Sequence, residues 1–162
     1  MTFIYVLTMC AIFYVLIQMP LGRLTHYYDV FVAADPKAVW DTYFIHVRGS
    51  DYRPRTRVLG YEVLSQNPLT VRITVKPYFS PIPVNVVTTF DLYEPYTRYR
   101  ERGGIGSIEA VEEGEFVSEP SGTRLHVAIT APRRGLLLPW IARRRVQRNM
   151  RALRDACEGR HT

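Results

Sequence analysis

The histidines and glutamates are the side chains of this sequence best suited to acid–base chemistry. General acid–base catalysis needs a group that titrates near the working pH and lies within reach of the substrate. Among the histidines, His46 and His126 lie away from the chain ends and from the first apolar run. His126 stands between Leu125 and Val127 in an alternating segment, so its side chain points opposite to theirs. If those two residues face the interior, His126 faces solvent, and the pattern favours a surface histidine over a catalytic one.

The segment EAVEEGE carries glutamates at positions 109, 112, 113 and 115. A pair of carboxylates can divide the roles of acid and base when their environments differ. On a strand, however, side chains alternate between two faces, so Glu109, Glu113 and Glu115 share one face. A solvated face is the simplest explanation of that arrangement, and the segment predicts no catalytic carboxylate pair.

Tyrosine is abundant, with eleven copies, and its hydroxyl can hold the polar end of a ligand. Tyr43, Tyr61, Tyr78 and Tyr99 are candidates for that role. β-Propensity is the simpler explanation for any single one of them.

Recognisable catalytic and metal-binding motifs are absent from the sequence. It contains no HExxH, paired CxxC, GxSxG or phosphate-binding loop. Cys10 and Cys157 lie in an apolar N-terminal run and in the last helical segment, which argues against a disulfide, and they lack metal-ligand spacing. We therefore predict no catalytic residue, no bound metal and no cofactor.

The first 22 residues, MTFIYVLTMCAIFYVLIQMPLG, contain no Asp, Glu, Lys or Arg. An apolar helix of about 20 residues can cross the hydrocarbon core of a bilayer, about 30 Å at 1.5 Å per residue. A cleaved signal peptide would need basic residues before the apolar run and small residues before the cut. A buried core helix and a start of the chain at Met19 are further alternatives. We expect residues 1–22 to form an uncleaved transmembrane anchor and residues 23–162 to form one domain. The first charged residue after the span is Arg23, and positive charges favour the cytoplasmic side, so we expect the domain in the cytoplasm.

From residue 25 onward the chain shows short alternating segments rich in β-forming residues. A strand signal over residues 25–34 is followed by a helix signal over residues 35–44, with Asp35 as N-cap and Pro36 at the first helical position. Residues 46–56 indicate a short second helix or a turn. Six further strands joined by short turns predict an antiparallel meander, over residues 57–66, 69–77, 84–95, 97–104, 107–119 and 123–132.

The last element is a long helix with one apolar stripe, at Ala142, Val146, Met150, Leu153 and Cys157. Pro139 fits only the first turn of a helix, so this one should begin close to that residue. Packed against the meander, the helix completes an α+β domain. The residues expected in its core are Val39, Trp40, Val127, Ile129, Val146, Met150 and Leu153.

The net charge of +6 belongs to the end of the chain. From residue 133 onward, nine arginines and two acidic residues give +7. Arg143, Arg144, Arg148, Arg151 and Arg154 fall largely off the apolar stripe and should face solvent. Nucleic-acid binding would require aromatic side chains interleaved with the basic ones, and none occurs between residues 143 and 160.

Three segments resemble the START-like or SRPBCC superfamily, which includes polyketide cyclases and dehydrases, lipid-transfer domains and coenzyme Q-binding proteins. They are VFVAADPKAVWDTYF, SEPSGTRLHVAITAP and GLLLPWIARRRVQRNMRALRDACE, and the resemblance covers about residues 25 to 158. It implies the helix-grip fold, a curved antiparallel sheet of about seven strands wrapped around a long C-terminal helix. It also implies a cavity for an apolar ligand between sheet and helix, and it carries no shared catalytic motif.

The resemblance further implies that three loops meet at the mouth of this cavity, namely residues 76–83, 103–107 and 131–140. All three carry apolar side chains, which would form an exposed patch typical of a membrane or partner contact, or would fold inward and plug the mouth. Neighbouring arginines would suit anionic head groups. The residues proposed for ligand contact are Tyr43, Tyr61, Tyr78, Phe79, Tyr99, Leu137 and Trp140. Those proposed for membrane contact are Phe79, Ile82, Ile105, Leu136, Leu138, Arg133, Arg134, Arg143 and Arg144.

Two functions agree with these observations. The first is a membrane-tethered, non-enzymatic module that binds or transfers an apolar ligand such as a lipid, an acyl chain or an isoprenoid quinone. The second is a cyclase or dehydratase acting on a bulky apolar substrate, with a tyrosine or histidine as acid or base. Two or more titratable side chains converging in the pocket would favour the enzyme, whereas an entirely apolar pocket would favour the carrier.

Overall fold

The computed structural model describes residues 20–44, 56–77, 81–105, 108–134 and 138–159. Its strands form one seven-stranded antiparallel sheet in the order β1-β7-β6-β5-β4-β3-β2. The strands are β1 (Pro20–Val32), β2 (Thr56–Gln66), β3 (Leu69–Pro77), β4 (Val84–Glu94), β5 (Arg98–Ile105), β6 (Ile108–Glu119) and β7 (Gly122–Arg134). From β2 to β7 each strand pairs with the next along the chain, which confirms the predicted meander.

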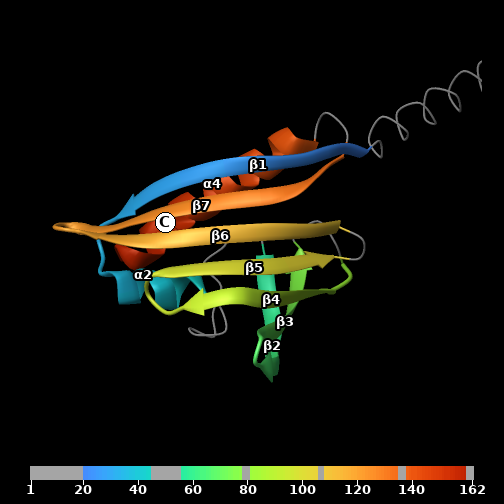
Figure 1. The fold of residues 1–162 in the computed structure, drawn as a ribbon, viewed down its shortest axis with the longest axis horizontal. Coiled ribbons are helices and arrows are strands. Elements are labelled where there is room, and N and C mark those ends of the chain that lie inside the picture. The colour runs from blue at the N-terminus through green and yellow to red at the C-terminus, as the bar shows by residue number, and fades with distance from the viewer. Residues whose placement is uncertain (1–19, 45–55, 78–80, 106–107, 135–137, 160–162) are drawn as a thin grey trace, which may run out of the picture.

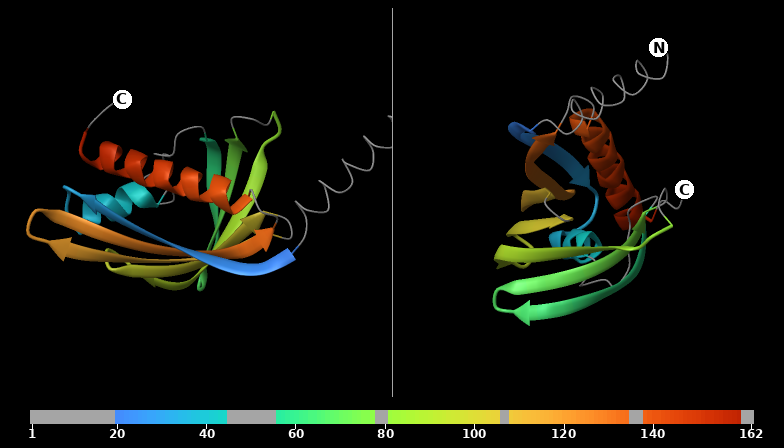
Figure 2. Two further views of the ribbon diagram at one scale, coloured as in Figure 1. Left: turned by 90° about the horizontal axis from the view of Figure 1, so that it is seen from above. Right: turned by 90° about the vertical axis from the view of Figure 1, so that its right-hand side faces the viewer.

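The sheet is strongly curved, and both helices lie on its concave face (Figure 1, Figure 2). They are α2 (Pro36–Tyr43) and α4 (Leu138–Cys157). Irregularities in pairing occur between Val58 and Gly60, and between Phe90 and Leu92. Such bulges bend a strand and increase its twist, which suits a sheet that closes around a helix. The α+β helix-grip architecture expected from the sequence is therefore confirmed.

Helix α2 begins where its sequence signals predicted. Asp35 adopts an extended backbone, and its side chain accepts a hydrogen bond from the Ala38 amide at 3.0 Å. Pro36 occupies the first turn. Proline has no backbone N–H, but a first-turn N–H would have no partner within the helix, so nothing is lost there. This cap holds Trp40 and Tyr43 at a defined place over the sheet.

Helix α4 begins at Leu138, one residue before Pro139, as predicted. Its apolar stripe packs toward the sheet, and Arg143, Arg144 and Arg148 are exposed on the other side. The core confirms the predicted set of residues. Val39, Trp40, Val127, Met150 and Leu153 are buried, and Ile129 and Val146 are partly buried against them.

The strands at one end of the sheet are longer than the sequence indicated. β1 begins at Pro20 rather than at residue 25, and β7 extends to Arg134, with Pro20 opposite Arg134 and Arg23 opposite Pro132. Each extension supplies hydrogen-bonding partners to the other. Residues 20–22, expected at the end of the membrane span, therefore belong to the sheet, and Arg133 and Arg134 lie on a strand instead of a loop.

Residues 1–19, which carry most of the predicted anchor, lie outside the described residues, and so does nearly all of the segment 46–56. Among the helices that the structure does describe, none combines the length and the apolar character that crossing a bilayer requires.

Candidate ligand site on the concave face

Two tyrosine hydroxyls and one carboxylate meet on the concave face. Tyr43 is the last residue of α2, Tyr99 lies near the start of β5, and Glu112 lies in the middle of β6. The Tyr99 hydroxyl lies 2.6 Å from Oε1 of Glu112 and 2.8 Å from the Tyr43 hydroxyl. Tyr43 donates a hydrogen bond to the same Oε1 atom. We call these three residues the Tyr–Tyr–Glu cluster.

A glycine makes room for this cluster. Gly114 pairs directly with Tyr99 across β5 and β6. A Cβ atom built on Gly114 would lie 2.1 Å from Cε1 and 2.6 Å from Cζ of the Tyr99 ring. Since real Cβ contacts are never that short, the ring occupies the space that any other residue would fill. Tyr99 thus lies flat over β6 and reaches Glu112, two residues away on the same face.

Aromatic side chains enclose one side of the cluster. Trp40, Phe44 and Phe116 all lie within 6.2 Å of the Tyr99 ring, measured between ring centroids. The pairs of Tyr99 with Trp40 and with Phe44 are edge-to-face, a favourable geometry for aromatic rings. Tyr99 is only 1% exposed, whereas Tyr43 and Glu112 are half-buried. Tyr43 and Glu112 therefore form the more exposed side of the cluster.

The surroundings keep the Tyr99 hydroxyl protonated. Burial raises its pKa well above the usual value of 10.0, and the negative charge of Glu112 adds to that shift. The Tyr99 hydroxyl therefore acts as a hydrogen-bond donor near neutral pH.

A second carboxylate lies beside the cluster. Glu101 of β5 stands directly opposite Glu112 of β6, and both side chains are half-buried on the concave face. Two carboxylates directly opposite each other on one face of a sheet repel each other. The concave face therefore carries at least three titratable side chains that converge, together with a fourth next to them.

The predicted acidic face of β6 is confirmed, but one member of the acidic run has the opposite orientation. Glu109, Glu113 and Glu115 are exposed. Glu112 is offset from them by an odd number of residues, so it points to the concave face. The same alternation that turns the other three to solvent is the sequence signal for the position of Glu112.

The ligand residues proposed from the sequence are distributed over several places. Tyr43 and Tyr99 are brought together, whereas Tyr61 lies on β2, separated from β5 by two strands. Trp140 lies in the first turn of α4. Tyr78, Phe79 and Leu137 lie outside the described residues.

Of the residues proposed for membrane contact, Ile82 is 69% exposed, and Arg143 and Arg144 are exposed on α4. Ile105 ends β5, and Arg133 and Arg134 end β7. Leu138 is the first residue of α4. Phe79 and Leu136 lie outside the described residues.

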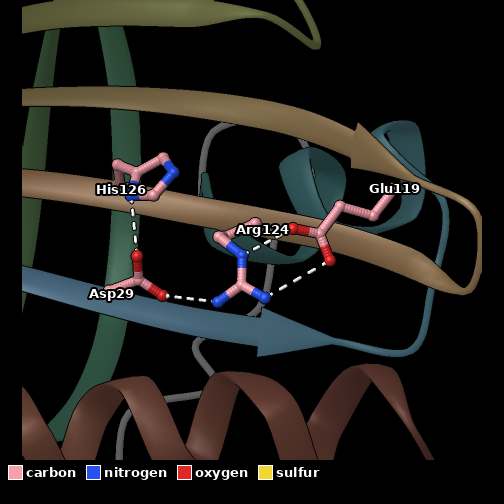
Figure 3. A network of polar contacts seen from close by, with 4 residues as sticks. All are labelled: Asp29, Glu119, Arg124 and His126. Carbon is pink, nitrogen blue, oxygen red and sulfur yellow. Dashed lines mark hydrogen bonds and ion pairs between the residues drawn. The ribbon is translucent and has the colours of Figure 1, made fainter.

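The convex face of the sheet carries a surface network of charges (Figure 3). His126 points outward, as predicted, and its Nδ1 atom lies 2.8 Å from Oδ2 of Asp29. Arg124 bridges the same aspartate, at 3.0 Å, to Glu119, at 2.5 Å. All four side chains are at least 30% exposed, so each pair contributes little to stability. Within the described ranges, no group of three or more His, Cys, Asp or Glu side chains could hold a metal ion.

Solved structures with the same fold are numerous, although no family model and no curated protein matches the sequence. The chain is similar to Ara h 8.0201, with a TM-score of 0.66 and 13% identity over 85% of this chain and 99% of that one. It is also similar to the Zhui aromatase/cyclase from Streptomyces sp. R1128, with a TM-score of 0.64 and 17% identity over 85% and 95% of the two chains. An AHSA1-like protein from Aeromonas hydrophila gives a TM-score of 0.63 and 14% identity over 85% and 96%.

These likenesses define the fold: the chain has a helix-grip fold, a curved antiparallel sheet packed around a long C-terminal helix. The sequence identities to these structures are only 10–17%, so the likeness shows the fold and none of the neighbours' activities.

Proposed function

We propose that this protein binds an apolar small molecule on the concave face, with a polar group of that molecule held by the Tyr–Tyr–Glu cluster. The observation that carries the proposal is the meeting of two tyrosine hydroxyls on one oxygen of Glu112, next to an aromatic core. Ligand sites of this kind combine apolar walls with a few polar groups that orient the ligand. A hydroxyl or carbonyl group on an otherwise apolar or aromatic body would match this chemistry.

The test is native mass spectrometry of the full chain extracted in mild detergent, to detect a co-purified small molecule. Ala110 faces the concave side two residues before Glu112, and Ala128 faces the opposite side on β7. We expect Ala110→Phe to release the bound molecule, because the added ring fills space beside the cluster. Ala128→Phe adds the same volume to the convex face and should leave the bound molecule in place. Equal occupancy in both variants would contradict the proposed position.

A cyclase or dehydratase activity is the second candidate, and the convergence of titratable side chains favours it over a purely passive carrier. Glu112 is placed to exchange a proton with a bound molecule, and the half-buried Tyr43 hydroxyl is placed to donate a hydrogen bond to an oxygen of that molecule. An aromatase/cyclase is among the proteins that share the fold.

The molecule identified by mass spectrometry also separates these candidates. It would be incubated with the ligand-free full chain and with Glu112→Gln, which keeps the shape of the side chain and removes its charge. Loss of water or rearrangement of the molecule by the wild type alone would establish catalysis. Binding without any change in the molecule would leave the protein as a carrier.

We also propose that residues 1–19 tether the domain to a membrane and that the domain lies on the cytoplasmic side. Support comes from the uncharged apolar run, from the exposed Ile82, and from the arginines along the outer side of α4. Basic residues near an anionic bilayer each contribute about 1 kcal/mol of attraction.

A further inference from the structure

A separate pocket lies at the seam between the edge strand β1 and helix α4. Its volume is about 310 Å³, and its lining includes Tyr28, Val30, Gln147, Met150, Arg151 and Arg154. The helical members recur every three or four residues, so they form one side of α4. In the part of the chain that the structure describes, β1 is an edge strand of the sheet, so this seam lies at the sheet's edge.

The floor of the pocket is apolar. Met150 is buried in the core, and Tyr28 and Val30 pack against that core from β1. These side chains offer a surface on which an alkyl or aryl group would lose contact with water, at about 25 cal/mol per Å² of apolar area.

The rim of the pocket is positively charged and carries an unsatisfied donor. Among the described residues, the buried Nε atom of Arg154 has no hydrogen-bond partner; it lies 3.9 Å from Oδ1 of Asp155, a long ion pair. Buried donors in folded proteins almost always have an acceptor, so this nitrogen is available to donate a hydrogen bond to a ligand. The rest of the Arg154 side chain is 43% exposed and can reach a molecule in the pocket.

Neighbouring charges reinforce the positive potential. Arg151 is exposed on the same side of the helix. Asp29 also borders the pocket, but its carboxylate binds Arg124 and His126 on the convex face.

We infer that this seam is a second binding site, which takes a small apolar molecule ending in a carboxylate. The apolar part lies on Tyr28, Val30 and Met150, and the carboxylate accepts hydrogen bonds from Arg154 and Arg151. A guanidinium group matches a carboxylate in geometry as well as in charge. The volume is near the lower limit for small-molecule sites, which indicates a short acyl or a single-ring body. The inference does not depend on the Tyr–Tyr–Glu cluster.

The test is isothermal titration calorimetry of the full chain in neutral-lipid nanodiscs, with empty nanodiscs subtracted. The probes are octanoate, octanol and acetate. We expect octanoate to bind at least tenfold more tightly than octanol, and acetate to give no measurable binding. Equal affinities for octanoate and octanol would overturn the inference, because the arginines would then contribute nothing.

Substitutions locate the octanoate. Arg154→Gln should weaken its binding at least tenfold, and Gln147→Trp, at an exposed position on the rim, should block it. Arg148→Gln removes the same charge from the outer side of α4 and should change the affinity less than twofold. An equal loss with Arg148→Gln would reveal general electrostatic attraction and overturn the inference. Loss with Glu112→Gln but not with Arg154→Gln would also overturn it, and would instead place octanoate at the site of the proposed function.

Discussion

The pairing of Tyr99 with Gly114 is the residue-scale feature on which the candidate site depends. The tyrosine ring lies over the glycine, and its hydroxyl then reaches the carboxylate of Glu112. Neither a larger residue at position 114 nor a shorter one at position 99 would give that contact. The site is thus specified by a missing side chain as much as by the side chains present.

Gly114→Ala should destabilise the protein because its methyl group would overlap the Tyr99 ring. Overpacking of this kind costs about 1–3 kcal/mol of the free energy of unfolding. Urea denaturation followed by circular dichroism measures the change. Gly60→Ala is the control, because a Cβ atom at Gly60 in β2 meets nothing within 4 Å. Similar stability for both variants would mean that the ring does not occupy this space.

The raised pKa of Tyr99 predicts a loss of stability in alkaline solution. The folded state holds the phenolic proton to a higher pH than the unfolded state does, so unfolding releases a proton above about pH 10. The stabilisation is complete below the unfolded pKa of about 10 and is lost as the pH rises toward the folded value. Urea unfolding at pH 8 to 11 should show a steeper decline for the wild type than for Tyr99→Phe. Identical slopes would contradict the burial of this hydroxyl.

At the scale of elements, α4 joins two surfaces of different kinds. Its stripe of Val146, Met150 and Leu153 packs against the sheet and α2, and its other side carries exposed arginines. The proline at its first turn determines where the helix starts. The seam with β1 arises because a cylindrical helix packed against a curved sheet leaves space along the sheet's edge.

Leu153→Ala should cost about 2–5 kcal/mol of the free energy of unfolding, because Leu153 is fully buried between α4 and the sheet. Leu59→Ala is the matched control, since Leu59 on β2 is 48% exposed and should lose about 0.5 kcal/mol or less. Chemical denaturation of both variants measures the difference. A small loss for Leu153→Ala would show that this side of α4 does not form the core.

At the scale of the whole molecule, the two edges of the sheet differ in how far they are covered. α4 lies along β1 at one edge, whereas β2 at the other edge is exposed on most of its length. Figure 2 shows both helices on the same side, which leaves the convex face to the charged network around His126. The start of β1, at Pro20, lies at the end of the sheet where β7 leads to α4.

The proposed tether predicts how the whole protein distributes between membrane and soluble fractions. An apolar helix across the bilayer resists both salt and alkali, because burial of apolar area and not charge holds it there. The full chain should therefore remain in the membrane pellet after washing at high salt and at alkaline pH. Release by high salt alone would indicate that only the arginines bind the membrane. Release by alkali would contradict a spanning segment.

The sequence by itself determined the order and type of the elements. Hydrophobic alternation, the Asp35-Pro36 start signal and the spacing of apolar residues in α4 are local properties, and each acts within a few residues of the chain. Strand ends were less well predicted, because the extension of β1 to Pro20 depends on pairing with β7, more than a hundred residues away.

The contacts of the Tyr–Tyr–Glu cluster could be recognised only in the folded structure. Tyr43 and Glu112 are 69 residues apart, and the residues around each one do not predict the contact between them. The contact of Tyr99 with Glu112 depends in turn on the register of β5 with β6, and a slip of one residue would turn Glu112 to the solvent face. The pocket between β1 and α4 likewise exists only once the helix has docked, because it is a gap between packed surfaces and not a property of either segment.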